Sequence, residues 1–449
     1  MDTSLLPRGL FIIMNPCFFK LYLCCFLWML FAGCKHKQAT GTVYLKSENG
    51  TYRFYRNGKP FFIKGGSGFT NLKALSEAGG NTIRVWDTVN IAAILDSAQA
   101  CHLAVIVGLP TPLNQNMDEF YNDEAKVAAH LTNISKTVNR YKHHPALLCW
   151  CVGNELAFPY KPNYNRFYSA FNNVVDMIHR DDPNHPVTTT IINFQRKNIA
   201  CIKFRTNIDF ISLNIFGDIK HLKYNLKDFG WLWKGPFLIT EWGIDGPWYP
   251  NYQTAWGSYV ENSSFKKAEQ YQAIYQNQMP LQDPRFLGSL VFYWGQKQEY
   301  TPTWFSLFDK TGRRSETVNA MSCLWKGERQ TLQAPPLKYI LLNQLGGRDN
   351  ILLPGDTMAQ GKVYLYGADT TGITYKWQLL PEDYHQVNNI YSQQNVVPIP
   401  NSFIGDSTGT SVSFRTPDKE GAYRLYVYAY NRQNYFATCN IPFYVLHQP

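Results

Sequence analysis

From residue 42 to about residue 330, short apolar runs alternate with longer segments whose apolar residues recur every three or four positions. Apolar runs bounded by turn residues predict buried strands, and the longer spacing predicts amphipathic helices, most clearly over 123–141 and 166–181. Such alternation favours an α/β fold in which eight parallel strands and their helices close into a (β/α)8 TIM barrel. The first strand follows an Asn57-Gly58 hairpin, and the others are expected at 81–87, 102–110, 146–155, 186–191, 208–217, 235–243 and 286–295.

The pattern changes near the pair Pro335-Pro336. Residues 336–449 contain no long helical pattern, and short runs of alternating apolar and polar residues take its place. Several such runs, with Trp377 in an early one, predict a C-terminal all-β immunoglobulin-like sandwich. No pair of cysteines flanks Trp377, so this sandwich is expected to lack the usual disulfide. The predicted domains are therefore a barrel at 42–330 and a sandwich at 336–449.

Residues 1–33 are predicted to be a targeting segment and not part of the fold. An apolar run follows Lys20 and ends in Phe31-Ala32-Gly33-Cys34. Small residues directly before a cysteine resemble a bacterial lipoprotein signal, which implies cleavage before Cys34 and its acylation. Residues 34–41 would be a tether, and the protein would be lipid-anchored in the cell envelope, facing the periplasm or the exterior. An ordinary secretory signal and an uncleaved anchor helix remain alternatives, as does a start at Met14.

Composition narrows the classes of partner. The formal net charge is +10, but lysines and arginines are scattered after residue 40, so nucleic-acid binding is not expected. The cysteines after residue 34 have neither metal-ligand spacing nor a disulfide pattern, and neither a metal nor another cofactor is expected. These cysteines are Cys101, Cys149, Cys151, Cys201, Cys323 and Cys439.

Two glutamates stand at the ends of predicted strands. Glu155 closes the run at 146–155, and Glu241 lies near the end of the run at 235–243. The carboxyl ends of barrel strands form the catalytic rim, so both side chains are expected there. Cleavage of a glycosidic bond needs two carboxyl groups, and a gap near ~5 Å indicates retention whereas ~6.5–9.5 Å indicates inversion. We predict that Glu155 is the acid/base and Glu241 the nucleophile.

The motifs Gly153-Asn154-Glu155 and Thr240-Glu241-Trp242-Gly243 resemble the acid/base and nucleophile motifs of clan A glycoside hydrolases. The similarity is closest to the catalytic barrel of glycoside hydrolase family 2, and extends to the barrel-plus-immunoglobulin enzymes of family 158. It covers about residues 42–328. The resemblance implies a retaining hydrolase of β-linked oligosaccharides or polysaccharides, with β-1,3-glucan as the first substrate to test and β-mannan or β-galactoside next.

The resemblance also implies roles for three further residues. Arg84 matches the arginine that supports the nucleophile, Asn154 the contact to the sugar 2-hydroxyl, and Trp294 the tryptophan beneath the cleaved sugar. One position departs from the family, because Phe216 replaces a tyrosine whose hydroxyl bonds the nucleophile. A hydrogen bond to a charged group contributes about 1.5–3 kcal/mol, so either another donor such as Arg84 suffices or activity is lower.

Further residues at or after strand ends are candidate sugar contacts. Aromatic rings stack on the C–H faces of pyranoses, and aromatic residues make up 15% of the chain. These candidates are Trp86, Asp87, Trp242 and Trp248, followed by Tyr249 and Trp256.

Three other functions remain open at this point. A non-catalytic glycan-binding lipoprotein would keep the barrel for capture, and Phe216 alone favours it. A transglycosylase would use the same two glutamates and pass the sugar to another sugar. An adhesin led by the sandwich predicts an exposed aromatic cluster, for which Tyr426, Tyr428 and Tyr430 alternate along one strand.

Overall fold

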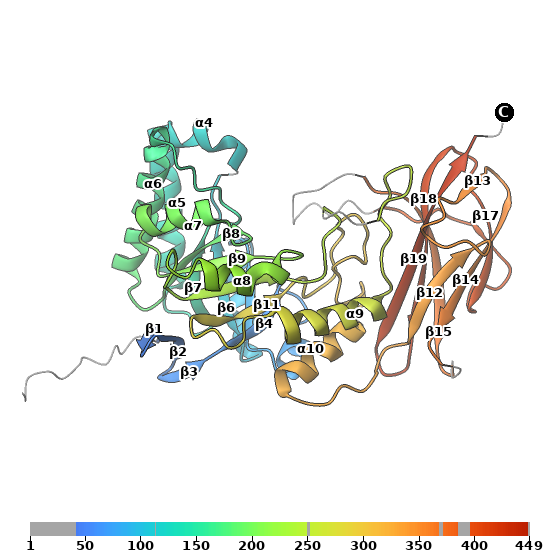
Figure 1. The fold of residues 1–449 in the computed structure, drawn as a ribbon, viewed down its shortest axis with the longest axis horizontal. Coiled ribbons are helices and arrows are strands. Elements are labelled where there is room, and N and C mark those ends of the chain that lie inside the picture. Colours follow the sequence, from blue (N-terminus) through green and yellow to red (C-terminus); the bar gives the residue numbers. More distant parts are fainter. Residues whose placement is uncertain (1–41, 113, 249–251, 368–370, 385–395, 448–449) are drawn as a thin grey trace, which may run out of the picture. The chain divides into compact units, whose positions relative to one another are not determined.

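Eight parallel strands close into a barrel in the order β10-β11-β4-β5-β6-β7-β8-β9. Figure 1 shows these strands with the helices that connect them, which confirms the predicted (β/α)8 fold. Nearly all of their residues are buried, because both faces of a barrel strand are covered. They are β4 (Ile63–Ser67), β5 (Thr82–Val85), β6 (Ala104–Leu109), β7 (Leu147–Val152), β8 (Val187–Ile192), β9 (Phe210–Asn214), β10 (Phe237–Trp242) and β11 (Phe286–Val291).

The computed structural model describes residues 42–112, 114–248, 252–367, 371–384 and 396–447. The predicted signal peptide and the whole predicted tether, which includes Cys34, lie outside these residues, as does Tyr249. Within them, no helix has the length and apolar character that a membrane crossing requires.

Helices follow each barrel strand and cover its outer face. Their apolar sides pack on the barrel, and α5 begins where the Asp123 carboxylate accepts a hydrogen bond from the Lys126 amide at 3.0 Å. The helices are α2 (Leu72–Glu77), α3 (Ile91–Ala100), α4 (Met117–Tyr121), α5 (Glu124–Tyr141), α6 (Asn165–Asp181), α7 (Arg196–Arg205), α8 (Ile219–Asp228), α9 (Ser264–Ala273) and α10 (Glu316–Lys326), with short turns η1 (Asn114–Asn116), η2 (Pro162–Tyr164) and η3 (Ile274–Gln278).

A small antiparallel sheet closes the N-terminal end of the barrel. It consists of β1 (Val43–Glu48), β2 (Thr51–Arg56) and β3 (Lys59–Phe61), with the predicted Asn57-Gly58 turn between the last two. Phe54 of this sheet lies in the same apolar cluster as the inward-facing barrel residues, and its ring centre is 5.4 Å from that of Phe210 at the start of β9. The carboxyl ends of the strands are therefore the end available for a site.

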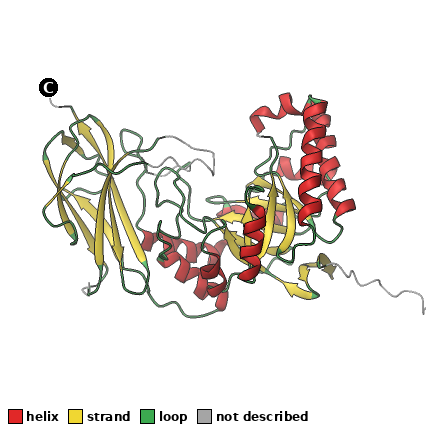
Figure 2. Cartoon of the chain, turned by 180° about the vertical axis from the view of Figure 1, so that it is seen from behind, coloured by secondary structure: helices red, strands yellow, loops and turns green. Residues whose placement is uncertain are grey.

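Two four-stranded sheets form the C-terminal sandwich, in the orders β12-β14-β17-β16 and β13-β19-β18-β15. They share one apolar core that includes Trp377, and Figure 2 shows only strands and loops there. Residues Gly41–Pro449 form one compact unit, in which α9 packs against β12 and β19. The strands are β12 (Leu337–Leu342), β13 (Leu352–Pro354), β14 (Met358–Leu365), β15 (Thr374–Pro381), β16 (Phe403–Ile404), β17 (Ser411–Arg415), β18 (Gly421–Tyr430) and β19 (Phe436–Leu446).

Tyr426, Tyr428 and Tyr430 of β18 stack in a row, with neighbouring ring centres 6.4 Å and 6.5 Å apart. Tyr426 is buried, and Tyr428 and Tyr430 are only partly exposed. An adhesin would need an exposed aromatic cluster here, so this strand does not support that alternative.

Candidate active site

Glu241, on β10, is a buried carboxylate with two donors on a single oxygen. Arg84 Nη1 forms a short ion pair with Oε1, and the indole Nε1 of Trp86 donates to the same atom at 2.7 Å. Arg84 lies on β5 and Trp86 directly follows that strand, so the two residues share one face at a spacing of two. Both donors bond the same carboxylate oxygen and so fix the orientation of the Glu241 side chain.

Arg84 also connects Glu241 to the opposite side of the barrel. Its Nη2 donates to Asn154 Oδ1 at 2.5 Å and lies 3.5 Å from Thr190 Oγ1 on β8. The side chain of Arg84 is 1% exposed. A buried guanidinium is tolerated when a carboxylate and further acceptors surround it, and these contacts meet that condition.

A sharp turn after β7 presents Glu155 to the site. Gly153 and Glu155 both have left-handed backbone conformations, with φ of 76° and 55°. That conformation is unfavourable for a residue with a side chain, and such residues are concentrated at functional sites. Asn114 stabilises the turn, because its amide donates to the Glu155 carbonyl and accepts from the Ala157 amide, both at 2.9 Å. The role of Asn114 has no signature in the sequence.

The Glu155 side chain is oriented by Asn214 at the end of β9. Asn214 Nδ2 donates to Glu155 Oε1 at 2.9 Å, and its Oδ1 accepts from Thr240 Oγ1 at 2.9 Å, which fixes the direction of the amide. Burial, and next the charge of Glu241, raise the pKa of Glu155, while Asn214 and Arg84 oppose that rise. A raised pKa keeps a carboxyl protonated near neutral pH, as a general acid requires.

One polar network therefore holds both predicted catalytic residues. It runs from Glu155 through Asn214 to Asn154, where the amide and carbonyl atoms are 3.3 Å apart, and from Asn154 through Arg84 to Glu241. The structure brings together residues from β5, β7, β9 and β10 at the carboxyl ends of the strands. In this arrangement, one carboxyl group can donate a proton to a bound molecule while the other attacks it as a charged nucleophile.

Two of the predicted sugar contacts are not formed. Trp242 and Trp294 have no exposed surface, and a covered ring cannot stack on a sugar. Trp242 packs against tyrosines of the α9–η3 region, and Trp294 packs so closely over Gly66 that a Cβ there would lie 2.5 Å from the Trp294 Cβ. Both assignments are corrected to core packing.

Trp86 also differs from its prediction as a sugar platform. Its ring is 9% exposed and stacks on Tyr293, with ring centres 5.9 Å apart, while its N–H is used on Glu241. Trp86 therefore supplies a donor to Glu241, the predicted nucleophile, where Phe216 provides none. The signal was present in the sequence, because Trp86 follows Arg84 at the spacing that places two side chains on one face of a strand.

The remaining predicted sugar contacts differ in exposure and in the residues around them. Trp248 is 49% exposed and meets the Phe216 ring edge to face, with centres 5.5 Å apart, so it offers a surface for a sugar. Asp87 follows Trp86, accepts a hydrogen bond from the Val89 amide at 2.7 Å, and has its pKa raised by burial. Trp256 packs against Tyr444 of β19.

A comparison with family models finds that residues 75–280 match "Glycosyl hydrolases family 2, TIM barrel domain". The matched range runs from α2 to just beyond η3 and includes every residue of the network between Glu155 and Glu241.

Solved structures with similar folds include three glycoside hydrolases. The endo-β-1,4-mannanase from Thermotoga petrophila is 14% identical, with a TM-score of 0.43, over 87% of this chain and 99% of its own. The β-D-glucuronidase from Dictyoglomus thermophilum is 18% identical, with a TM-score of 0.48, over 65% of this chain and 54% of its own. A β-glucuronidase from Bacteroides uniformis is 12% identical, with a TM-score of 0.49, over 91% of this chain and 48% of its own. This chain spans about half the length of the two glucuronidases.

Proposed function

We propose that this chain is a retaining β-glycosidase that works by double displacement; the match of residues 75–280 to the family 2 barrel model supports a glycoside hydrolase. The observation that carries the proposal is the network that joins Glu155 and Glu241 through Asn214, Asn154 and Arg84. It supports different roles for two carboxyl groups at one site, one paired with a cation and one with its pKa raised.

In the first step, Glu241 attacks the anomeric carbon while Glu155 gives its proton to the departing glycosidic oxygen. The glycosidic bond breaks and a glycosyl ester of Glu241 forms. Arg84 and Trp86 both bond one oxygen of Glu241, which leaves the other oxygen of that carboxylate for the new bond.

In the second step, Glu155 acts as a base. Formation of the ester removes the charge of Glu241, and this lowers the pKa of Glu155, because that charge raised it in the free enzyme. The ionised Glu155 takes a proton from water, the water oxygen attacks the anomeric carbon, and Glu241 leaves as a carboxylate. Two inversions at one carbon give net retention.

For the substrate, we propose a β-linked glycan, with β-1,3-glucan as the first assay and β-mannan and β-galactoside next. Trp248 is the exposed ring that would lie along such a chain. We further propose that the protein is held at the cell envelope by acylation of Cys34. A Cys34→Ala variant should then lose incorporation of labelled palmitate and leave the membrane fraction.

The test of the function compares wild type with Glu241→Gly and Glu155→Gly on β-glucans, β-mannan, β-galactosides and aryl β-glycosides. Wild type should release a product whose anomeric proton is first observed by NMR in the β configuration. Both variants should lose turnover, and azide should restore it, with an α-glycosyl azide formed by Glu241→Gly and a β-glycosyl azide formed by Glu155→Gly.

Glu119→Gln is the matched control, because this exposed glutamate on α4 lies outside the network. It should retain wild-type turnover. An α product formed first, or equal turnover by wild type and Glu241→Gly, would exclude double displacement through Glu241.

A further inference from the structure

The segment after β11, residues 297–305, borders the candidate site, and we call it the rim segment. It carries an ion pair between Lys297 and Glu299, and Lys297 Nζ lies 5.0 Å from the ring centre of Phe292. The Phe292 ring meets Trp86 edge to face at 6.2 Å, and Trp86 donates to the nucleophile Glu241. The ion pair therefore lies at the mouth of the barrel, next to the catalytic network.

Two contacts tie the rim segment to the C-terminal sandwich, one on each side of Glu299. Gln298 Nε2 donates to Asp383 Oδ2, just after β15, at 3.2 Å. Thr301 and Thr303 donate to the Glu261 carboxylate at 2.7 Å and 2.8 Å, and that carboxylate accepts from Asn440 Nδ2 of β19 at 2.7 Å.

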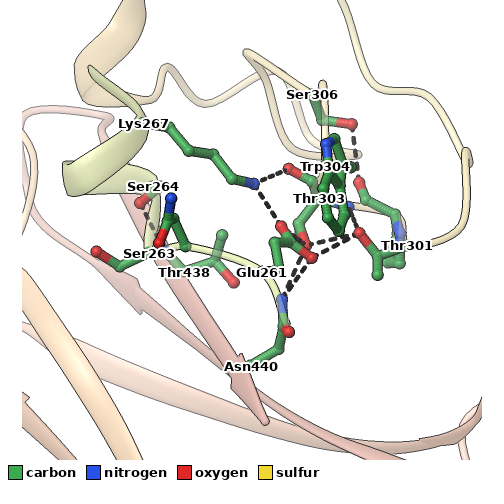
Figure 3. A network of polar contacts seen from close by, with 12 residues as sticks. Glu261, Ser263, Ser264, Lys267, Thr301, Thr303, Trp304, Ser306, Thr438 and Asn440 are labelled. Atoms are coloured by element: carbon green, nitrogen blue, oxygen red, sulfur yellow. Dashed lines mark hydrogen bonds and ion pairs between the residues drawn. The ribbon is translucent and has the colours of Figure 1, made fainter. Parts of the chain in front are cut away.

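Figure 3 shows that Glu261 is the centre of this second contact. Its side chain is 1% exposed and is paired with Lys267 of α9, whose Nζ also donates to the Thr303 carbonyl at 2.7 Å. The orientation of the Asn440 amide is fixed, because Arg424 Nη1 donates to its Oδ1 at 2.7 Å. A buried carboxylate is costly unless each acceptor site is used, so the loss of Asn440 would disturb the groups that Glu261 holds.

We infer that the C-terminal sandwich is a positioning part of the active site. Asn440 holds Glu261, Glu261 and Asp383 hold the rim segment, and the rim segment keeps the Lys297–Glu299 pair at the barrel mouth. The inference rests on the proposed function, since the pair acts on the acid/base residue. Burial raises the pKa of Glu155 most, the charge of Glu241 comes next, and the charge of Glu299 raises it further.

The direction of the effect follows from the groups around Glu155. Glu241 of β10 and Glu299 of the rim segment disfavour its ionised form, whereas Arg84 of β5 and Asn214 of β9 favour it. Replacing Glu299 by glutamine removes a negative charge and leaves Lys297 unpaired. Both changes lower the pKa of Glu155.

The test measures the titration of Glu155 directly, by carbon NMR of protein labelled at the glutamate carboxyl carbons. The signal is assigned by its loss in Glu155→Gln. Four proteins are compared: wild type, Glu299→Gln, Asn440→Ala and the double variant. Because the titration needs no substrate, it decides this inference even when no glycan in the panel is cleaved, and failure of the proposed function is recognised separately.

We expect Glu299→Gln to lower the pKa of Glu155, and Asn440→Ala to lower it less. In the double variant, Asn440→Ala should cause no additional shift, because the sandwich acts through Glu299. Val412→Ala is the control, since it opens a cavity in the sandwich core on β17, in the sheet that does not contain Asn440. It should leave Glu155 at its wild-type pKa.

Three results would overturn the inference: no shift with Glu299→Gln, no shift with Asn440→Ala, or an Asn440→Ala shift that persists unchanged in the Glu299→Gln background. Where Asn440→Ala does not fold, Gln298→Ala replaces it, because this change removes only the contact of a partly exposed side chain with Asp383. The same expected and contrary results apply to that variant.

Discussion

The hydrogen bond from Trp86 to Glu241 gives the sharpest prediction about the proposed nucleophile. The indole N–H donates at 2.7 Å to a carboxylate that is 5% exposed, where water cannot replace it. A hydrogen bond to a charged group contributes about 1.5–3 kcal/mol, which corresponds to about 10- to 150-fold in rate. Trp86→Phe keeps an aromatic ring against Tyr293 and removes the donor, so kcat/KM should fall by this factor.

The assay uses an aryl β-glycoside with a good leaving group, so that departure does not depend on the proton of Glu155. The loss of kcat/KM then reports on attack by Glu241. The midpoint of urea unfolding is measured on the same proteins, to separate a loss of rate from a loss of folded protein.

Trp242→Phe is the matched control for this prediction. Its indole is also buried and also lies on the barrel, but its N–H has no hydrogen-bond partner among the described residues. It should lose much less activity than Trp86→Phe at a similar cost in stability. If Trp86→Phe keeps more than a third of the wild-type kcat/KM, or if both variants lose the same factor, the donor role of Trp86 is refuted.

Three further predictions concern other parts of the site. Trp248→Ala should raise KM on an oligosaccharide several-fold and change kcat less, because the exposed ring contacts substrate away from the bond that breaks; Michaelis kinetics decide between the two parameters. Asn214→Ala should move the basic limb of the kcat/KM profile to higher pH, since Asn214 lowers the pKa of Glu155; a limb that moves to lower pH would contradict this. Burial acts to raise the pKa of Glu261, but Lys267 and other partners outweigh it and lower that pKa, so its ionised form stabilises the fold above about pH 4.5 and this stability is lost as the pH falls further. The urea concentration at the midpoint of wild-type unfolding should therefore decrease as the pH falls below 4.5, and this decrease should be smaller for Glu261→Gln.

The positions of the strands and of the two glutamates were predictable from the sequence. Continuous apolar runs mark strands that are covered on both faces, and an acid at the end of such a run is placed on the rim of a barrel by the topology. The placement of Glu155 and Glu241 on this rim follows from that pattern.

The roles of the tryptophans were not predictable in the same way. Trp86, Trp242 and Trp294 all stand at strand ends, yet one donates to Glu241 and two are covered by neighbouring side chains. Which ring is covered depends on how helices and loops pack around the strand ends, and a local pattern does not encode that. The contact of Asn440 with Glu261 joins residues 179 positions apart and leaves no periodic signal.

The small sheet that carries Phe54 has a consequence for the direction in which the candidate site opens. It seals one end of the barrel and is also the place where the described chain enters the domain. If residues ahead of β1 attached the protein to a surface, the attachment would be at the covered end of the barrel. The candidate site, at the opposite end of the barrel, would then open away from that surface, where a long glycan chain could reach it.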